Sequence, residues 1–223
     1  MPDQIKRILL VEGKNDLFVV GDLWKSNGLP EHYFEIEACG SDKGLLKKMK
    51  EYLSASEEGR PEKFGIILDA DIQTASVRWD AIKMRLTTGN YASYANYTPP
   101  DNLDINGTIV LGSGKYPDIG IWIMPDNLSK GMLEDFLAKL APEDAMEFAK
   151  QCVVDAKNKG FTTFKDVHQS KAEIHTYLAW QDEPGNPLGT SIAAKALNAK
   201  HPIVKVFIEF LKNLFSDNNG EIT

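Results

Sequence analysis

Three acidic residues stand at the ends of two apolar runs. Glu12 follows residues 5–11, and Asp69 and Asp71 follow residues 64–68. Carboxylate oxygens are the ligands that Mg²⁺ prefers, and this ion keeps several waters that a substrate can replace. A metal held here could activate water against a phosphate ester, with Glu12 moving a proton. The alternative is that Asp71 only caps the next helix and Glu12 is a solvated turn residue.

Both apolar runs predict buried parallel strands, because they are short, nearly continuous and followed by turns. Ligands of open α/β sheets bind at the carboxyl ends of strands, so neighbouring strands would bring these acids together. We therefore expect the carboxylates of Glu12, Asp69 and Asp71 to lie about 4–8 Å apart, close enough to share one ion.

The spacing of apolar residues along the rest of the chain predicts an α/β protein in which helices flank a mostly parallel sheet, with a helical C-terminal extension. We expect a metal-binding domain over residues 1–140 and the extension over residues 141–223. The first helix should be capped by Asn15. Residues 87–106 predict a long surface loop, and residues 179–189 predict a rigid turn packed on the core. The predicted strands are residues 5–11, 33–39, 64–68, 107–111 and 119–124, and the later predicted helices are residues 44–53, 74–86, 132–140, 143–157, 170–180, 191–199 and 203–215.

The composition excludes several classes of protein. The 223 residues include 25 basic and 32 acidic ones, a net charge of -7, which argues against a broad basic face for duplex nucleic acid. A bound metal ion would invert this charge locally. Cys39 and Cys152 have no CxxC partner, so no zinc site is expected. Without an apolar span or secretory signal, the sequence predicts a cytoplasmic protein with no membrane contact.

The acids and the order of elements together resemble the TOPRIM domain. This domain is shared by topoisomerases, bacterial primases, small RNA-maturation nucleases and the overcoming-lysogenization-defect nucleases. The matching residues are 8–16 (ILLVEGKND), Gly40 and 65–71 (GIILDAD). Residues 121–136 and 171–189 are similar to a small uncharacterised bacterial family allied to the overcoming-lysogenization-defect group. The resemblance implies a TOPRIM-like sheet that binds Mg²⁺, with Mn²⁺ as a substitute.

In that nuclease group the resemblance implies two metals and further ligands. Asp16 matches an acid four residues after the glutamate, a spacing that directs both carboxylates to one site. Glu134 matches a later acid, with Asp135 as the alternative, and Met132 stands where the family often has serine. Lys171 matches a phosphate-facing catalytic lysine, although a solvated helix lysine is the alternative.

Two further residues are predicted to line the site. Gly40 ends the second predicted strand, and Asp126 lies in the turn after the last one. The alternative for Asp126 is an ordinary turn or helix-capping role, which aspartate often has.

Two functions therefore remain open. The first is a Mg²⁺-dependent nuclease that acts on DNA or RNA, because three intact acids suit phosphodiester chemistry. The alternative is a non-catalytic module that binds a nucleotide or nucleic acid through metal in a defence or regulatory assembly. Because the resemblance includes nucleases fused to an ATPase, a separate ATPase is an expected partner.

Overall fold

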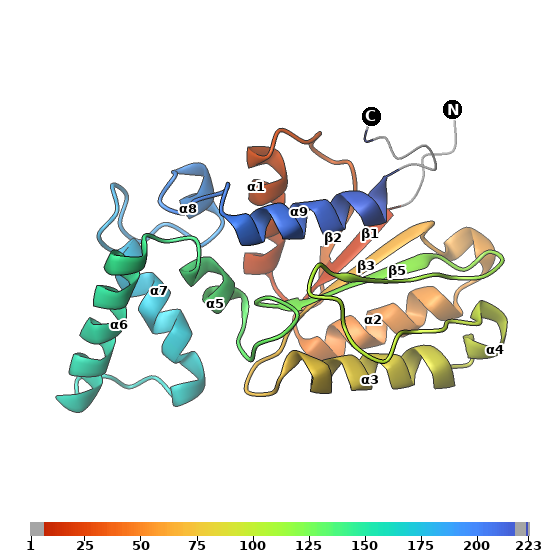
Figure 1. Ribbon diagram of the computed structural model, residues 1–223, viewed down its shortest axis with the longest axis horizontal. Helices are drawn as coiled ribbons and strands as arrows, with labels where there is room; N and C mark the ends of the chain where they lie inside the picture. Colours follow the sequence, from red (N-terminus) through yellow and green to blue (C-terminus); the bar gives the residue numbers. More distant parts are fainter. Residues whose placement is uncertain (1–6, 217–221, 223) are drawn as a thin grey trace.

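The chain forms an α/β fold in which helices cover both faces of one mostly parallel sheet (Figure 1). The computed structural model describes residues 7–216 and residue 222. Within them the sheet has five strands in the order β2-β1-β3-β5-β4, and only β4 is antiparallel to its neighbour. The strands are β1 (Arg7–Val11), β2 (Glu35–Ala38), β3 (Lys63–Asp69), β4 (Thr108–Val110) and β5 (Asp118–Met124). The predicted α/β class, a mostly parallel sheet flanked by helices, is thus confirmed.

The helices are divided between the two faces of the sheet (Figure 1). One face is covered by α1 (Lys14–Ser26) and α9 (Pro202–Phe215), and the other by α2 (Asp42–Ser54) and α3 (Ala75–Thr88). Beyond one end of the sheet, α6 (Glu143–Asn158) packs on α7 (Gln169–Leu178). Shorter helices are α4 (Ala92–Ala95), α5 (Leu133–Ala138) and α8 (Thr190–Ala193), with 3₁₀ turns at Glu57–Gly59 and Asp166–His168. No helix in the described residues is long and apolar enough to cross a membrane.

The central strands are buried on both faces, because successive side chains point to opposite helical layers. In β1, Leu9 and Val11 join the core under α1 and α9, whereas Ile8 and Leu10 join the core under α2 and α3. Two-sided burial explains why this strand is a continuous apolar run. The structure also confirms that β1 and β3 are parallel neighbours.

Helix α9 lies directly on the sheet at two glycines. Gly65 of β3 and Gly120 of β5 are paired in register, and a side chain at either position would collide with Leu214. A Cβ built on Gly120 would lie 2.4 Å from Cδ2 of Leu214, so glycine lets the helix approach closely. Helix α9 thereby shares one core with strand residues such as Leu9 and Ile67. The division into residues 1–140 and 141–223 stays a prediction.

Replacing Gly120 with alanine should lower the free energy of unfolding by about 1–3 kcal/mol, because the added methyl group overpacks the contact with α9. Gly21→Ala is the matched control, since a Cβ at Gly21 of α1 would meet no atom within 4 Å. That variant should be as stable as the parent, or up to about 1 kcal/mol more stable. Urea denaturation measures both changes. A Gly120→Ala protein as stable as the parent would contradict this packing.

The predicted cap of the first helix is wrong. Helix α1 begins at Lys14, so Asn15 lies inside it and Gly13 is the N-cap residue. The side chain of Asp16 accepts the backbone N–H of Gly13 at 3.0 Å. Because Asp16 satisfies this terminal N–H group, the helix starts earlier than the position of Asn15 suggested.

Residues 87–106 are more than the predicted surface loop. They contain α4, and the side chains of Tyr91 and Tyr97 are buried in the core formed with α2 and α3. Both hydroxyl groups donate to backbone carbonyl oxygens, those of Arg85 and Pro117. Tyrosine is frequent in loops and in cores, so composition did not reveal this burial.

Two features after residue 178 also differ from expectation. Helix α8 spans Thr190–Ala193, whereas the sequence predicted a longer helix over residues 191–199. Trp180, expected as the core anchor of its turn, is 47% exposed, and its ring centroid lies 5.5 Å from that of the exposed Phe148. The preceding residues Tyr177 and Leu178 are buried instead.

Candidate functional site

Glu12 and Asp69 meet at the carboxyl edge of the sheet. Glu12 follows the last residue of β1, and Asp69 is the last residue of the neighbouring β3. The Oε1 atom of Glu12 accepts the backbone N–H of Asp69 at 2.8 Å. Glu12 therefore reaches across from its own strand towards β3, as the sequence predicted. Because one oxygen is held by a backbone group, the direction of this carboxylate is set by the sheet.

Asp16 joins this pair from the first turn of α1. Its Oδ2 atom accepts the N–H of Gly13, and its side chain is only 7% exposed. The negative charge of Asp16 raises the pKa of both Glu12 and Asp69. The spacing of four residues after Glu12 therefore places both acids in one electrostatic environment.

Glu134, rather than Asp135, faces the other acids. The backbone N–H of Leu133 donates to Oδ1 of Asp69 at 3.0 Å, which joins the start of α5 to the end of β3. Glu134 is 4% exposed, and its charge raises the pKa of Asp69 and Asp16. Asp135 instead accepts the N–H of its neighbour in the helix cap, Met132, at 2.8 Å.

Glu12, Asp16, Asp69 and Glu134 form an acidic cluster. Lys171 of α7 contacts this cluster at one carboxylate. Its Nζ atom lies 3.2 Å from Oε1 of Glu134, and its side chain is 46% exposed. The predicted lysine thus stands beside the predicted acid, although the two residues come from different helices. Its exposure leaves it accessible to a substrate, and its catalytic role stays a prediction.

Asp71 lies in a strained loop joined to the start of α5. Its φ of 57° is in the left-handed region, which is costly for a residue other than glycine. Two backbone hydrogen bonds with Gly131, at 2.7 and 2.9 Å, hold this conformation. Oδ2 of Asp71 forms an ion pair with Arg78 of α3. Strain maintained in this way is characteristic of functional loops.

Arg78 and Asp42 are site neighbours that the sequence did not reveal. The guanidinium of Arg78 contacts both Asp71 and Asp42, and its NH1 atom lies 3.3 Å from Oδ2 of Asp42. The negative charge of Asp42 also raises the pKa of Glu12. Because Arg78 and Asp42 lie on different helices, no local spacing could have paired them.

Burial raises the pKa of three acids in the cluster. Loss of solvent is the largest cause in each case and raises the pKa of Asp69 to about 9, of Glu12 to about 7 and of Asp16 to about 6. The negative charges of neighbouring acids add to this effect. At neutral pH these raised pKa values favour a carboxyl group that stays protonated in the cluster.

The remaining predicted residues lie outside this contact network. Gly40 is exposed and has a φ of 82°, in the turn that leads to α2. Asp126 accepts the N–H groups of Leu128 and Ser129, and Oδ2 of Asp126 lies 3.2 Å from Nζ of Lys139. Among the described residues, the side chain of Asp126 forms no hydrogen bond or ion pair with the carboxylates of the cluster. These contacts favour the ordinary turn role.

The cluster is not arranged as a ready metal site. Among residues 7–216, no three acidic, histidine or cysteine side chains could hold a metal ion as they stand. One oxygen each of Glu12 and Asp69 is bound to a backbone N–H, and Asp71 is turned to Arg78. Repulsion between charged carboxylates also opposes convergence. The spacing of about 4–8 Å expected for a shared ion stays a prediction.

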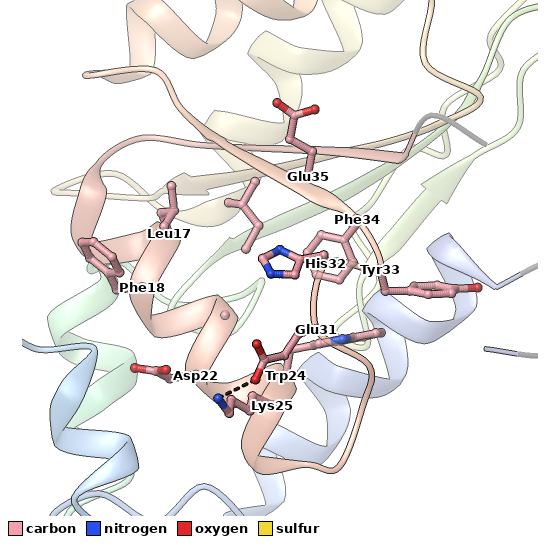
Figure 2. Close-up of a pocket in the computed structure, with 12 residues that line it drawn as sticks. Leu17, Phe18, Asp22, Trp24, Lys25, Glu31, His32, Tyr33, Phe34 and Glu35 are labelled. Carbon is pink, nitrogen blue, oxygen red and sulfur yellow. Dashed lines mark ion pairs between the residues drawn. The ribbon is translucent and has the colours of Figure 1, made fainter. Parts of the chain in front are cut away.

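A hollow of about 440 Å³ lies away from the carboxylates, between α1 and the edge strand β2 (Figure 2). Aromatic rings of Phe18, Trp24 and Phe34 line it, together with an ion pair between Lys25 and Glu31. Phe18 is 55% exposed. None of the residues predicted for the metal site lines this hollow.

Comparison with known proteins gives one match. The model of a family described as "Protein of unknown function (DUF3226)" matches residues 6–216. No curated protein and no solved structure matches the chain.

Proposed function

The chain belongs to the DUF3226 family, and we propose that it is a TOPRIM-like, Mg²⁺-dependent nuclease acting on DNA or RNA. The observation that carries this proposal is the gathering of Glu12, Asp16, Asp69 and Glu134 at one edge of the sheet. Burying like charges together opposes folding unless a proton or a cation compensates for them. Such a cluster is therefore expected where a divalent cation binds.

The carboxylates present are suited to a hard cation. Glu12, Asp69 and Glu134 each have one oxygen held by a backbone N–H or by Lys171. Within the described residues, the second oxygen of each of these three acids has no hydrogen-bond or ion-pair partner. Oxygen ligands of this kind suit Mg²⁺ or Mn²⁺. Side-chain rotations would be needed to bring them to one ion.

Each residue of the candidate site has a distinct proposed role. A bound Mg²⁺ would supply charge stabilisation and an activated water. Glu12, whose carboxylate is oriented by the N–H of Asp69, is suited to accept and return a proton. Lys171 is exposed and can contact a phosphate oxygen beside Glu134. Asp16 and Asp69 hold the cation with Glu134, and Asp71 completes the expected set.

The second candidate function is a binding module without turnover. The net charge of -7 and Met132, in a position where the resemblance implies serine, favour this alternative. A thioether is a poor ligand for Mg²⁺, so a second metal is not supported there. A separate ATPase partner is proposed for either function on the resemblance alone.

A cleavage assay tests the proposal. The purified chain should cut at least one of single-stranded DNA, single-stranded RNA and nicked duplex DNA in Mg²⁺ or Mn²⁺, because the metal provides the nucleophile. EDTA should abolish cutting. Asp69→Asn, purified identically, excludes a contaminating nuclease if it is inactive. A parent protein that binds these nucleic acids with metal but cuts none of them supports the binding module instead.

A further inference from the structure

Arg78 is a half-buried cation beside the acidic cluster. It lies near the start of α3, and its side chain is 20% exposed. Its two terminal nitrogens contact two carboxylates, those of Asp42 and Asp71. Arg78 and its two carboxylate partners together carry one net negative charge. The two ion pairs hold the guanidinium in place from both sides.

The guanidinium has hydrogen-bonding capacity left over. A guanidinium has five N–H donors arranged to match the oxygens of a phosphate. Each terminal nitrogen of Arg78 has two N–H groups, and within the described residues one contact to Asp42 and one to Asp71 occupy only one N–H of each. Because the side chain is 20% exposed, an oxygen acceptor from outside the protein can approach these remaining donors. Carboxylates from the protein fill only part of this capacity.

Two cations therefore lie at the site, one in contact with the cluster and one in contact with Asp71 beside it. Lys171 is paired with Glu134, whereas Arg78 is paired with Asp71. A phosphate group approaching the acidic cluster would be repelled by its negative charges unless positive groups stood nearby. Arg78 is the less mobile of the two, because it is less exposed and is held from two sides.

We propose that Arg78 binds a non-bridging phosphate oxygen of a nucleic-acid substrate. Asp42 acts as a positioning residue, because it orients the guanidinium from α2 without needing to touch the substrate. The proposal rests on the proposed nuclease function and assigns to that site a second phosphate contact besides Lys171. A phosphodiester chain is favoured over free phosphate, since it can contact Arg78 and Lys171 together.

Binding to the full chain tests this role without requiring cleavage. The probe is a fluorescein-labelled single-stranded DNA oligonucleotide in Ca²⁺, followed by anisotropy, with inorganic phosphate as a competitor. Arg78→Ala should weaken oligonucleotide binding by at least ~10-fold, because a charged hydrogen bond is lost. Arg78→Lys should bind with intermediate strength, because it keeps the charge but not the fork of donors.

Matched controls separate binding from folding. Arg85→Ala removes an arginine from the same helix, whose guanidinium donates to the backbone oxygen of Ala81 and forms no ion pair within the described residues, and should bind like the parent. Asp42→Asn should weaken binding less than Arg78→Ala, since the arginine remains. Mn²⁺ affinity of Arg78→Ala, measured by calorimetry, should not fall more than about 3-fold below that of the parent, because Arg78 is not a ligand and its removal frees Asp71. Melting curves verify that each variant is folded.

The outcomes distinguish the two proposals. If the parent binds neither this probe nor labelled single-stranded RNA or nicked duplex DNA, both the proposed function and the role of Arg78 are overturned. If the parent binds and Arg78→Ala binds equally well, only the role of Arg78 is overturned. Loss of Mn²⁺ binding in both Arg78→Ala and Arg78→Lys would instead make Arg78 a structural support for Asp71. Competition by inorganic phosphate as strong as by unlabelled oligonucleotide would contradict a phosphodiester ligand.

Discussion

Replacing Glu12 with glutamine should lower the rate of metal-dependent cleavage by at least ~100-fold, because a general acid-base group and a charged ligand are both lost. The amide oxygen of glutamine can still accept the N–H of Asp69, which Glu12 accepts at 2.8 Å. The variant therefore changes charge and proton transfer while keeping the contact between β1 and β3. Single-turnover rates on a labelled oligonucleotide measure the loss.

Glu58→Gln is the matched control for this substitution. Glu58 is an exposed residue in the 3₁₀ turn Glu57–Gly59 and is not one of the residues of the candidate site. The Glu58→Gln variant should therefore cut at the parental rate. The melting temperature of Glu12→Gln should not fall below that of the parent, because a half-buried charge is removed. A Glu12→Gln protein that cuts within about 3-fold of the parental rate would exclude Glu12 from the chemistry.

Asp69 should make the metal-free protein less stable as the pH rises. Its pKa is about 9 in the folded chain against 3.8 ordinarily, chiefly through burial. Between these values the folded state binds a proton that the unfolded state has released, so the free energy of unfolding falls with increasing pH. This contribution is complete below about pH 4 and is lost as the pH passes through the folded pKa near 9.

Asp69→Asn should flatten this dependence and melt at least about 5 °C higher than the metal-free parent at pH 9, because no charge is buried. Mg²⁺ or Mn²⁺ should raise the melting temperature of the parent, increasingly so from about pH 6 to 9, since it replaces the bound proton. It should not raise that of Asp69→Asn. Thermal melts at several pH values, with and without EDTA, measure both effects.

The exposed Asp182 provides the control for the pH series, and Asp182→Asn should follow the parental profile. Parent and Asp69→Asn profiles that coincide would show that Asp69 does not retain a proton on folding. If metal stabilises Asp69→Asn as much as the parent, Asp69 is not a ligand, whatever its proton affinity.

Local sequence determined the strands that deliver the acids. The apolar runs before Glu12 and Asp69 are buried on both faces, and this burial requires continuous apolar residues regardless of the rest of the chain. Once such strands are parallel neighbours, residues after their carboxyl ends meet at one edge. The spacing from Glu12 to Asp16 likewise depends only on helix geometry. These features were therefore predictable from short segments.

Only the tertiary structure decided which side chains face one another across elements. Glu134 and Asp135 are adjacent in sequence, and the docking of α5 on the end of β3 turns the first to the acids and leaves the second in a helix cap. The pairing of Arg78 with Asp42 depends on two helices that cover the same face of the sheet. Such contacts arise from packing between distant segments, which residue type and spacing along the chain do not encode.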